Sequence, residues 1–322
     1  MSPAEAAPDT ISPLKAEWTS ALDDLPPVAG EQGKIPAFFF AHGSPLLLKN
    51  QEPSGPAASI IGSHGPNSPL AEFLVDFGLQ LVMKYTPKAI VVFSAHWETE
   101  GETLVTDYGS NNPLLYDYYG FKKELYEVTF ESFGDSALSN QVVDLLTKAG
   151  ISARTTLKEE ARGKDGRGFM GPGLDHGVFV PFKLMFGDWL NIPVMQVSID
   201  GSLNPERNWA LGKALDELRS QGILILSGGL TIHTFRDMSA WSEKTASAQV
   251  REFHSAIIEA VRSPPDSLKS ELCKLIGLPG FREAHPREEH FVPIYVAAGA
   301  GESGAARVIS TQYGAATFAF GV

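Results

Sequence analysis

The chain has 322 residues, of which 43% are hydrophobic and 20% are charged, and this composition predicts a globular protein with a sizeable core. The formal net charge of −12 argues against nucleic acid or an anionic membrane surface as a partner, because both require clustered Lys and Arg. The single cysteine, Cys273, excludes a disulfide within the chain and a thiolate metal cage, and it fits a reducing cytoplasm.

The N-terminal region shows no targeting or membrane signal. No apolar run in the chain approaches the ~20 residues of a membrane span. The first 34 residues are acidic, lack Arg and have no signal-type apolar core. We therefore expect a cytoplasmic protein with a flexible or loosely docked N-terminal arm over residues 1–34 and a single domain over residues 35–322.

Strand-like and helix-like segments alternate after the arm. In chain order they are a strand (37–41), a helix (68–85), two strands (90–95 and 103–107), a helix (135–149), a helix capped by Asp175, a strand (192–199), a helix (204–220), a strand (223–227), two helices (242–262 and 286–298) and two terminal strands (308–310 and 316–320). This alternation predicts an α/β fold with a central mixed, partly parallel β-sheet flanked by helices.

Three buried strand patterns each end close to a histidine. His42 follows residues 37–41, His96 follows residues 90–95, and His233 follows the third strand after two glycines. Ligands of open α/β sheets bind at the carboxyl ends of parallel strands. We therefore expect a metal site at this edge of the sheet.

Further histidines complete the candidate set. His290 lies at the predicted start of the helix over residues 286–298, and His176 follows Asp175. Neutral imidazole binds Zn, Fe, Cu and Ni, so the candidate ligands are His42, His96, His233 and His290, with His176 close by. The alternative interpretation is that each is a hydrogen-bonded core histidine.

The remaining histidines have simpler interpretations. His64 lies in a polar loop and is expected to be solvated, whereas His254 falls on the apolar face of a helix and is expected to pack in the core. His285 precedes a proline and is expected to orient the loop that leads to His290. The aromatic segment 113–126 forms either the edge of the core or the wall of a pocket for a planar ligand.

Several motifs together resemble the class III extradiol ring-cleavage dioxygenases, in particular the 4,5-DOPA dioxygenase branch. They are His42-Gly43-Ser44-Pro45, Ser94-Ala95-His96-Trp97, Asp175-His176-Gly177, Ser227-Gly228-Gly229 with His233, and Glu289-His290-Phe291. The resemblance covers about residues 36–322 and implies a single catalytic domain.

The resemblance also implies a mechanism. Such an enzyme inserts both atoms of O2 into a small aromatic diol at an Fe(II) site, or holds Zn(II) there, and forms a semialdehyde. It implies His42 and His96 as two ligands, with His290 or Glu289 as the third. His233 is implied as a further ligand or as the acid/base, and His176 as a group that hydrogen-bonds the substrate or dioxygen.

Two other function classes stay open. A zinc hydrolase would use metal-bound water, but the sequence has no His-Glu-x-x-His helix to supply the usual glutamate. A non-catalytic protein similar to the Memo family would bind a metal or a protein partner on the same fold. The physiological catechol, the position of ring cleavage and the oligomeric state are not indicated by the sequence.

Overall fold

The computed structural model describes residues 11–28, 33–49, 64–161 and 171–322. Its centre is an eight-stranded sheet in the order β4-β3-β5-β2-β6-β1-β8-β7. The strands are β1 (Ala37–Ala41), β2 (Ala89–Thr99), β3 (Thr103–Thr106), β4 (Ala153–Thr156), β5 (Val194–Asp200), β6 (Ile223–Gly229), β7 (Ala306–Ser310) and β8 (Thr317–Phe320). Parallel and antiparallel pairs both occur, which confirms the predicted mixed sheet.

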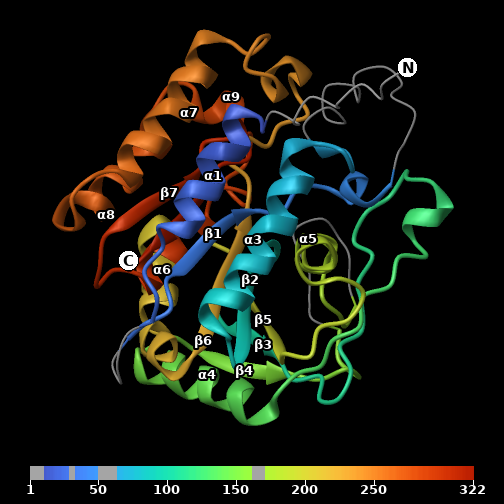
Figure 1. Ribbon diagram of the computed structural model, residues 1–322. Coiled ribbons are helices and arrows are strands. Elements are labelled where there is room, and N and C mark those ends of the chain that lie inside the picture. The colour runs from blue at the N-terminus through green and yellow to red at the C-terminus, as the bar shows by residue number, and fades with distance from the viewer. Residues whose placement is uncertain (1–10, 29–32, 50–63, 162–170) are drawn as a thin grey trace, which may run out of the picture.

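Helices cover both faces of this sheet (Figure 1). One face carries α1 (Pro13–Asp23), α3 (Pro69–Tyr85) and α5 (His176–Phe186). The other carries α4 (Ser136–Lys148), α6 (Pro205–Lys213), α7 (Ala248–Val261), α8 (Pro265–Lys274), α9 (Phe281–Ala284) and α10 (Pro293–Ala300). The side chains of strand β1 alternate between these two layers. Phe38 and Phe40 pack with the first set of helices, and Phe39 packs with the second. Both faces of the strand are therefore apolar, as expected for a strand covered on two sides.

Strands β1 and β6 end level with each other, and β2 extends beyond them. β1, β6 and β2 are parallel neighbours, and Ser227 of β6 pairs with Phe39 on one side and Phe93 on the other. The regular pairing of β2 with β5 then shifts between Phe93 and Glu98. His96 lies inside this irregular stretch, so β2 continues past the predicted strand end but turns its side chains out of the regular register.

The chain before α10 differs from the prediction. The expected helix over residues 286–298 starts only at Pro293, and His290 lies in the turn before it rather than at a helix start. Pro293 suits the first helical position because that position needs no backbone N–H partner. The carbonyl of His290 accepts a hydrogen bond from Leu230 N at 2.8 Å, which fixes His290 against the exit of β6. Gly229 permits this approach, because a Cβ there would lie 2.4 Å from the same carbonyl oxygen.

The bounds of other helices also differ from the prediction. The helix predicted over residues 242–262 begins at Ala248, and the one predicted over residues 204–220 is α6 followed by a 3-10 helix over Asp216–Gln221. Strand β4 and helix α8 were not predicted from the sequence. Within the part of the chain that the structure describes, no helix combines the length and apolar character needed to cross a bilayer.

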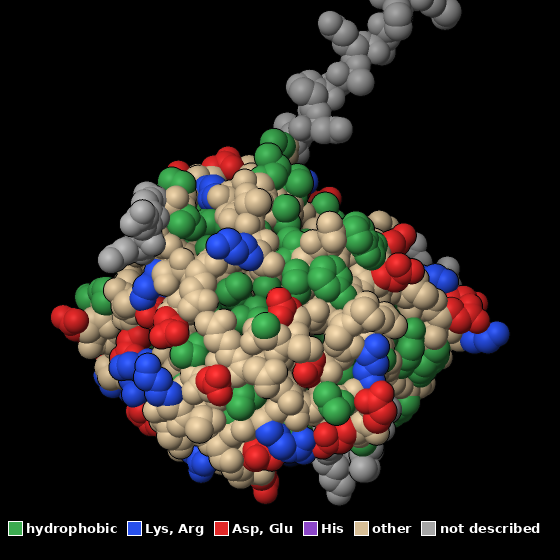
Figure 2. Space-filling model, turned by 90° about the horizontal axis from the view of Figure 1, so that it is seen from below, with side chains coloured by type: hydrophobic (Ala, Val, Ile, Leu, Met, Phe, Trp, Pro, Cys, Tyr) green, Lys and Arg blue, Asp and Glu red, His purple; other side chains and the backbone are tan. Residues whose placement is uncertain are grey.

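The face of the molecule seen from below in Figure 2 carries acidic, basic and apolar side chains. Figure 2 shows basic and acidic side chains interspersed on this face, with apolar side chains between them and no histidine visible. The histidines of the candidate site are therefore not open to this face.

The expectation of a flexible arm over residues 1–34 is wrong for residues 13–23, which form α1. The hydroxyl of Ser12 caps the helix by accepting from Lys15 N at 3.2 Å. Trp18 is fully buried, packs edge-on against Phe73 at 5.6 Å between ring centroids, and donates from Nε1 to Asp76 Oδ2 at 2.9 Å. The buried indole of Trp18 thus anchors the helix on α3, together with Leu22 and the hydrogen bonds from Lys84 to the helix end.

The anchor makes a testable prediction. Trp18→Ala should lower the free energy of unfolding by about 3–5 kcal/mol, because it removes a fully buried indole and leaves a cavity. Urea denaturation followed by circular dichroism measures the change. Trp189→Ala is the matched control, since Trp189 is 55% exposed and its loss should cost less than about 1 kcal/mol. Equal losses in the two variants would contradict the docking of α1.

Candidate metal centre

Three histidines from distant parts of the sequence meet at the carboxyl ends of the central strands. His42 follows β1, His96 lies in the irregular part of β2, and His290 precedes α10. Each side chain offers a ring nitrogen, and these nitrogens lie within 4.8 Å of one another. All three residues are buried, with at most 3% of their surface exposed.

Two carboxylates set the tautomers of His96 and His290. His96 Nδ1 lies 3.1 Å from Asp117 Oδ2, and His290 Nδ1 lies 3.2 Å from Glu289 Oε1. An ionised carboxylate can only accept a hydrogen bond, so both Nδ1 atoms carry the proton and both Nε2 atoms present a lone pair. Those two Nε2 atoms are 3.2 Å apart.

Facing lone pairs at this distance repel one another unless a proton or a metal ion lies between them. Two nitrogens that bind one metal at ~2.0–2.1 Å and at right angles are separated by about 3 Å, close to the separation found here. The tautomers and the spacing therefore fit a metal ion.

His42 provides the third nitrogen. Among the described residues, neither of its buried ring nitrogens has a hydrogen-bond partner. Burial, followed by the nearby His290 and His176, holds the pKa of His42 well below its usual value, so the ring is neutral. A buried neutral imidazole without a partner is costly in a core but is suited to a metal. The donor set of this chain thus fits the metal that the sequence predicted.

His233 lies beside this group rather than within it. Its ring stacks on that of His290, with 3.4 Å between centroids and 13° between planes. Its Nδ1 lies 3.9 Å from Glu289 Oε1. Burial and the neighbouring His290 hold the pKa of His233 well below its usual value, so the ring is neutral.

Asp117 is a site residue that the sequence analysis missed. It is fully buried and accepts from His176 Nδ1 at 2.7 Å and from the backbone N of His176 at 2.9 Å, while its other oxygen faces His96. Burial alone would raise the pKa of Asp117, but His176 and His96 hold it well below its usual value. The available signal was a lone carboxylate between Tyr116 and Tyr118 in an otherwise aromatic stretch.

A second carboxylate fixes His176 at the start of α5. Asp175 caps this helix by accepting from Gly177 N at 2.9 Å, as predicted. It also accepts from Ser94 Oγ at 2.7 Å and from Gln196 Nε2 at 2.5 Å. Strands β2 and β5 therefore both hold the helix end that carries His176.

The histidines face a cavity of about 390 Å³. Part of its wall is aromatic and includes Tyr118, Tyr119, Phe121, Phe235 and Trp241. The aromatic segment 113–126 thus supplies pocket wall, although Tyr118 is also buried in the core beneath it.

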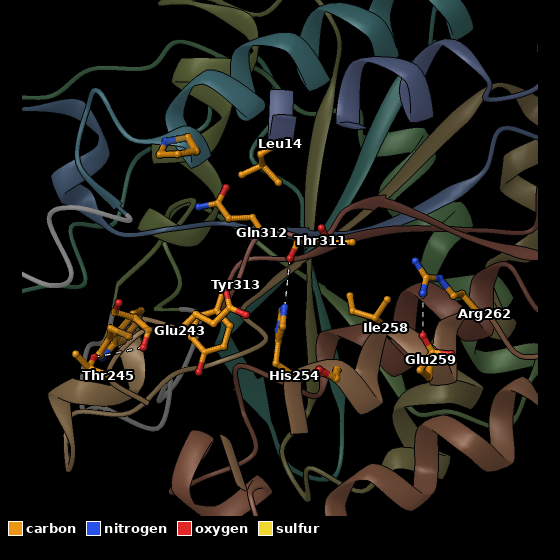
Figure 3. A pocket seen from close by; sticks show the side chains of 14 residues that line it. Leu14, Glu243, Thr245, His254, Ile258, Glu259, Arg262, Thr311, Gln312 and Tyr313 are labelled. Atoms are coloured by element: carbon orange, nitrogen blue, oxygen red, sulfur yellow. Dashed lines mark hydrogen bonds and ion pairs between the residues drawn. The ribbon is translucent and has the colours of Figure 1, made fainter. Parts of the chain in front are cut away.

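The remaining histidines lie elsewhere or differ from expectation. The expectation that His64 is solvated is wrong, because it is 1% exposed and lines the same cavity. His285 is buried and its Nε2 donates to Thr231 O at 3.0 Å, and burial lowers its pKa to about 4. His254 lines a separate groove of about 930 Å³, shown in Figure 3, where its Nε2 lies 3.3 Å from Thr311 O.

An ion pair joins the two chain segments that carry His96 and His290. Arg287 donates from Nη1 to Glu98 Oε1 at 2.8 Å and from Nη2 to Glu98 Oε2 at 2.5 Å. Glu98 lies two residues after His96, and Arg287 lies three residues before His290. This two-bond contact fixes the turn against β2 and so fixes the distance between the two rings.

This contact predicts a loss of metal affinity. Arg287→Ala should weaken Zn(II) binding about 10–100-fold, because the residues that orient ligands affect affinity to this extent. Competition with a chromogenic chelator measures the dissociation constant. Arg282→Ala is the control, because the Arg282 side chain is 59% exposed and forms an ion pair with Glu288 instead of with Glu98. Unchanged affinity in Arg287→Ala would show that the ion pair does not position the site.

Comparison with known proteins agrees with this geometry. Residues 36–321 match the model of the family described as the catalytic LigB subunit of aromatic ring-opening dioxygenase. A 4,5-DOPA dioxygenase extradiol-like protein from Schizosaccharomyces pombe is 42% identical over 309 residues, which cover 95% of this chain and 97% of that relative. A 4,5-DOPA dioxygenase extradiol from Beta vulgaris is 30% identical over 287 residues, with 88% and 94% covered.

A solved structure shows the same fold. The crystal structure of an uncharacterized protein from Escherichia coli K12 superposes with a TM-score of 0.62 at 23% identity, covering 89% of this chain and 100% of that one. The family match and the two relatives confirm the resemblance found in the sequence. The chain therefore belongs to the LigB family of aromatic ring-opening dioxygenases and is an oxidoreductase of the extradiol class.

Proposed function

We propose that this enzyme cleaves a small DOPA-like catechol at an Fe(II) ion bound by His42, His96 and His290. The observation that carries the proposal is the pair of Nε2 lone pairs of His96 and His290, 3.2 Å apart, beside the unpartnered ring of His42. The names of the relatives from S. pombe and B. vulgaris support a DOPA-like substrate.

The third ligand is proposed to be His290 rather than Glu289. Glu289 Oε1 faces the Nδ1 side of His290, so the carboxylate lies behind the ring, on the side away from the facing Nε2 atoms. The group that meets within 4.8 Å of His42 and His96 contains His290 and not Glu289. Glu289 is instead proposed to fix the tautomer of His290 by accepting its Nδ1 proton.

An Fe(II) ion held by His42, His96 and His290 would supply the redox chemistry that a catechol and O2, which differ in spin, need in order to react. Zn(II) fits the same three nitrogens but has no redox chemistry, so zinc would occupy the site in an inactive form. The other steps fall to side chains of the chain.

His233 is proposed as the base that takes a catechol proton. A phenol ionises near pH 10 in water, so at neutral pH the substrate needs a proton acceptor. His233 is neutral, lines the cavity and stacks on His290 next to the proposed ion. General base catalysis of this kind contributes about 10²–10⁴-fold in rate.

His176 is proposed to hydrogen-bond the bound substrate or dioxygen. Asp117 accepts the Nδ1 proton of His176, so Nε2 can accept from a substrate hydroxyl or, once it carries a proton, donate to dioxygen, and the residue lines the cavity. The ring of His176 lies 4.0 Å from that of His96 between centroids, so it is close to the proposed ion without sharing the three-histidine group.

The direct test loads the purified protein with Fe(II) without oxygen and then adds L-DOPA and O2. We expect oxygen uptake together with a yellow semialdehyde product. Protein loaded with Zn(II) should show neither. The absence of uptake and of a coloured product with L-DOPA, catechol and 4-methylcatechol would contradict the proposal and favour a binding or hydrolytic role.

Two variants separate metal binding from turnover. His96→Ala should lose Fe(II), because it removes one of three ligands, whereas His233→Ala should keep Fe(II) and lose about 10²–10⁴-fold in kcat. Metal content by atomic emission and initial rates of oxygen uptake measure the two effects. His254→Gln, in the separate groove, is the control for a histidine change elsewhere and should alter neither. Full iron occupancy in His96→Ala would refute the ligand assignment.

A further inference from the structure

His64 is a buried histidine of the cavity that the proposed mechanism does not use. Only 1% of its surface is exposed, yet it lines the cavity that also contains His42 and His233. Among the described residues, it belongs neither to the group of His42, His96 and His290 nor to any other group of side chains close enough together to hold a metal ion. Its place in the cavity therefore calls for another role.

The imidazole of His64 has no partner in the described part of the chain. No hydrogen bond joins either of its ring nitrogens to another described residue, and Nδ1 is completely buried. Burial lowers the pKa of His64 to about 4, so at neutral pH the ring is uncharged and offers one donor and one acceptor. A buried polar group in this state is costly unless a bound molecule completes its hydrogen bonds.

His64 belongs to a continuous aromatic wall. Its ring packs edge-on against Trp241, with 5.1 Å between centroids and 86° between planes. Trp241 in turn lies 6.2 Å from His233 and 6.0 Å from Phe235. Trp241 is held in place because its Nε1 donates to Thr234 O at 2.6 Å. The wall is thus fixed, and His64 is a polar group set into it.

A catechol whose two hydroxyls face the metal must direct the rest of its ring, with any substituent, toward the cavity wall. His64 lines the same cavity as His42, but among the described residues it belongs to no group of side chains close enough together to hold one metal ion. It is therefore placed to meet the substituent and not the reacting hydroxyls.

We propose that His64 recognises a polar substituent of the catechol ring through a hydrogen bond and so selects among catechols. This inference rests on the proposed function and adds a specificity residue to it. A neutral imidazole can pair with an amine, a carboxylate or a hydroxyl on the side chain, whereas a purely apolar substituent leaves it unpaired.

The test compares two catechols that differ in this substituent. L-DOPA carries a polar side chain and 4-methylcatechol carries an apolar one. His64→Phe should lower kcat/KM for L-DOPA about tenfold or more and leave that for 4-methylcatechol within about twofold, because only the first substrate loses a hydrogen bond. His64→Gln, which keeps a donor and an acceptor, should restore part of the preference.

A second readout does not depend on turnover. The dissociation constants of both catechols for Zn(II)-loaded protein, measured by calorimetry without oxygen, should show the same selective loss in His64→Phe. His254→Phe makes the same replacement outside the cavity and should leave the ratio of the two constants unchanged.

The outcomes are distinct. Equal losses for both catechols, or no loss for either, would overturn the role of His64 while the wild-type activity stands. A wild-type protein that neither binds nor cleaves the two catechols would instead contradict the proposed function itself.

Discussion

The structure depends on one close approach, between the Nε2 atoms of His96 and His290 at 3.2 Å. With a proton on each Nδ1, the two Nε2 atoms present lone pairs to each other, so the arrangement does not stabilise the rings by itself. Asp117 and Glu289 fix it by holding the protons on the opposite nitrogens. The close approach of the two rings is therefore unfavourable by itself and leaves a position that a cation can fill. The ring of His42, which has no hydrogen-bond partner among the described residues, completes that position.

The surrounding scaffold serves this arrangement. The end of β6 holds the segments that carry His42 and His290. Gly229 O accepts from His42 N at 3.1 Å, and His290 O accepts from Leu230 N. Gly229 is needed where the His290 carbonyl passes, and the pair of Glu98 and Arg287 fastens the same turn to β2. Rigid elements therefore set the distances between the nitrogens, which is the condition for a metal site of defined geometry.

The sequence predicted the parts of the site that follow from local pattern. Buried strand runs can be recognised from composition alone, and a histidine at the end of each run placed His42 and His96 at one edge of a parallel sheet. His290 was identified as a candidate, but its turn was mistaken for a helix because the apolar spacing continues into α10. The start of that helix depends on contacts with β6, which are far away in the sequence.

Other parts of the site have at most a weak local signal. Asp117 acts through two histidines, 21 and 59 residues away, and nothing in its own neighbours indicates those partners. His64 is surrounded in sequence by Gly, Ser and Pro, and only its tertiary contact with Trp241 shows that it is buried. Helix α1 was likewise assigned to a flexible or loosely docked arm, because few of its residues, above all Trp18, are apolar and buried in the core.

The central claim is that one ion binds to three histidines. The most direct measurement is the anomalous diffraction of crystals of the Fe(II)-loaded protein kept without oxygen. The account predicts a single peak between the Nε2 atoms of His96 and His290 and in bonding contact with a ring nitrogen of His42. A peak bound to the Glu289 carboxylate in place of His290, or one lying away from His42, would contradict it.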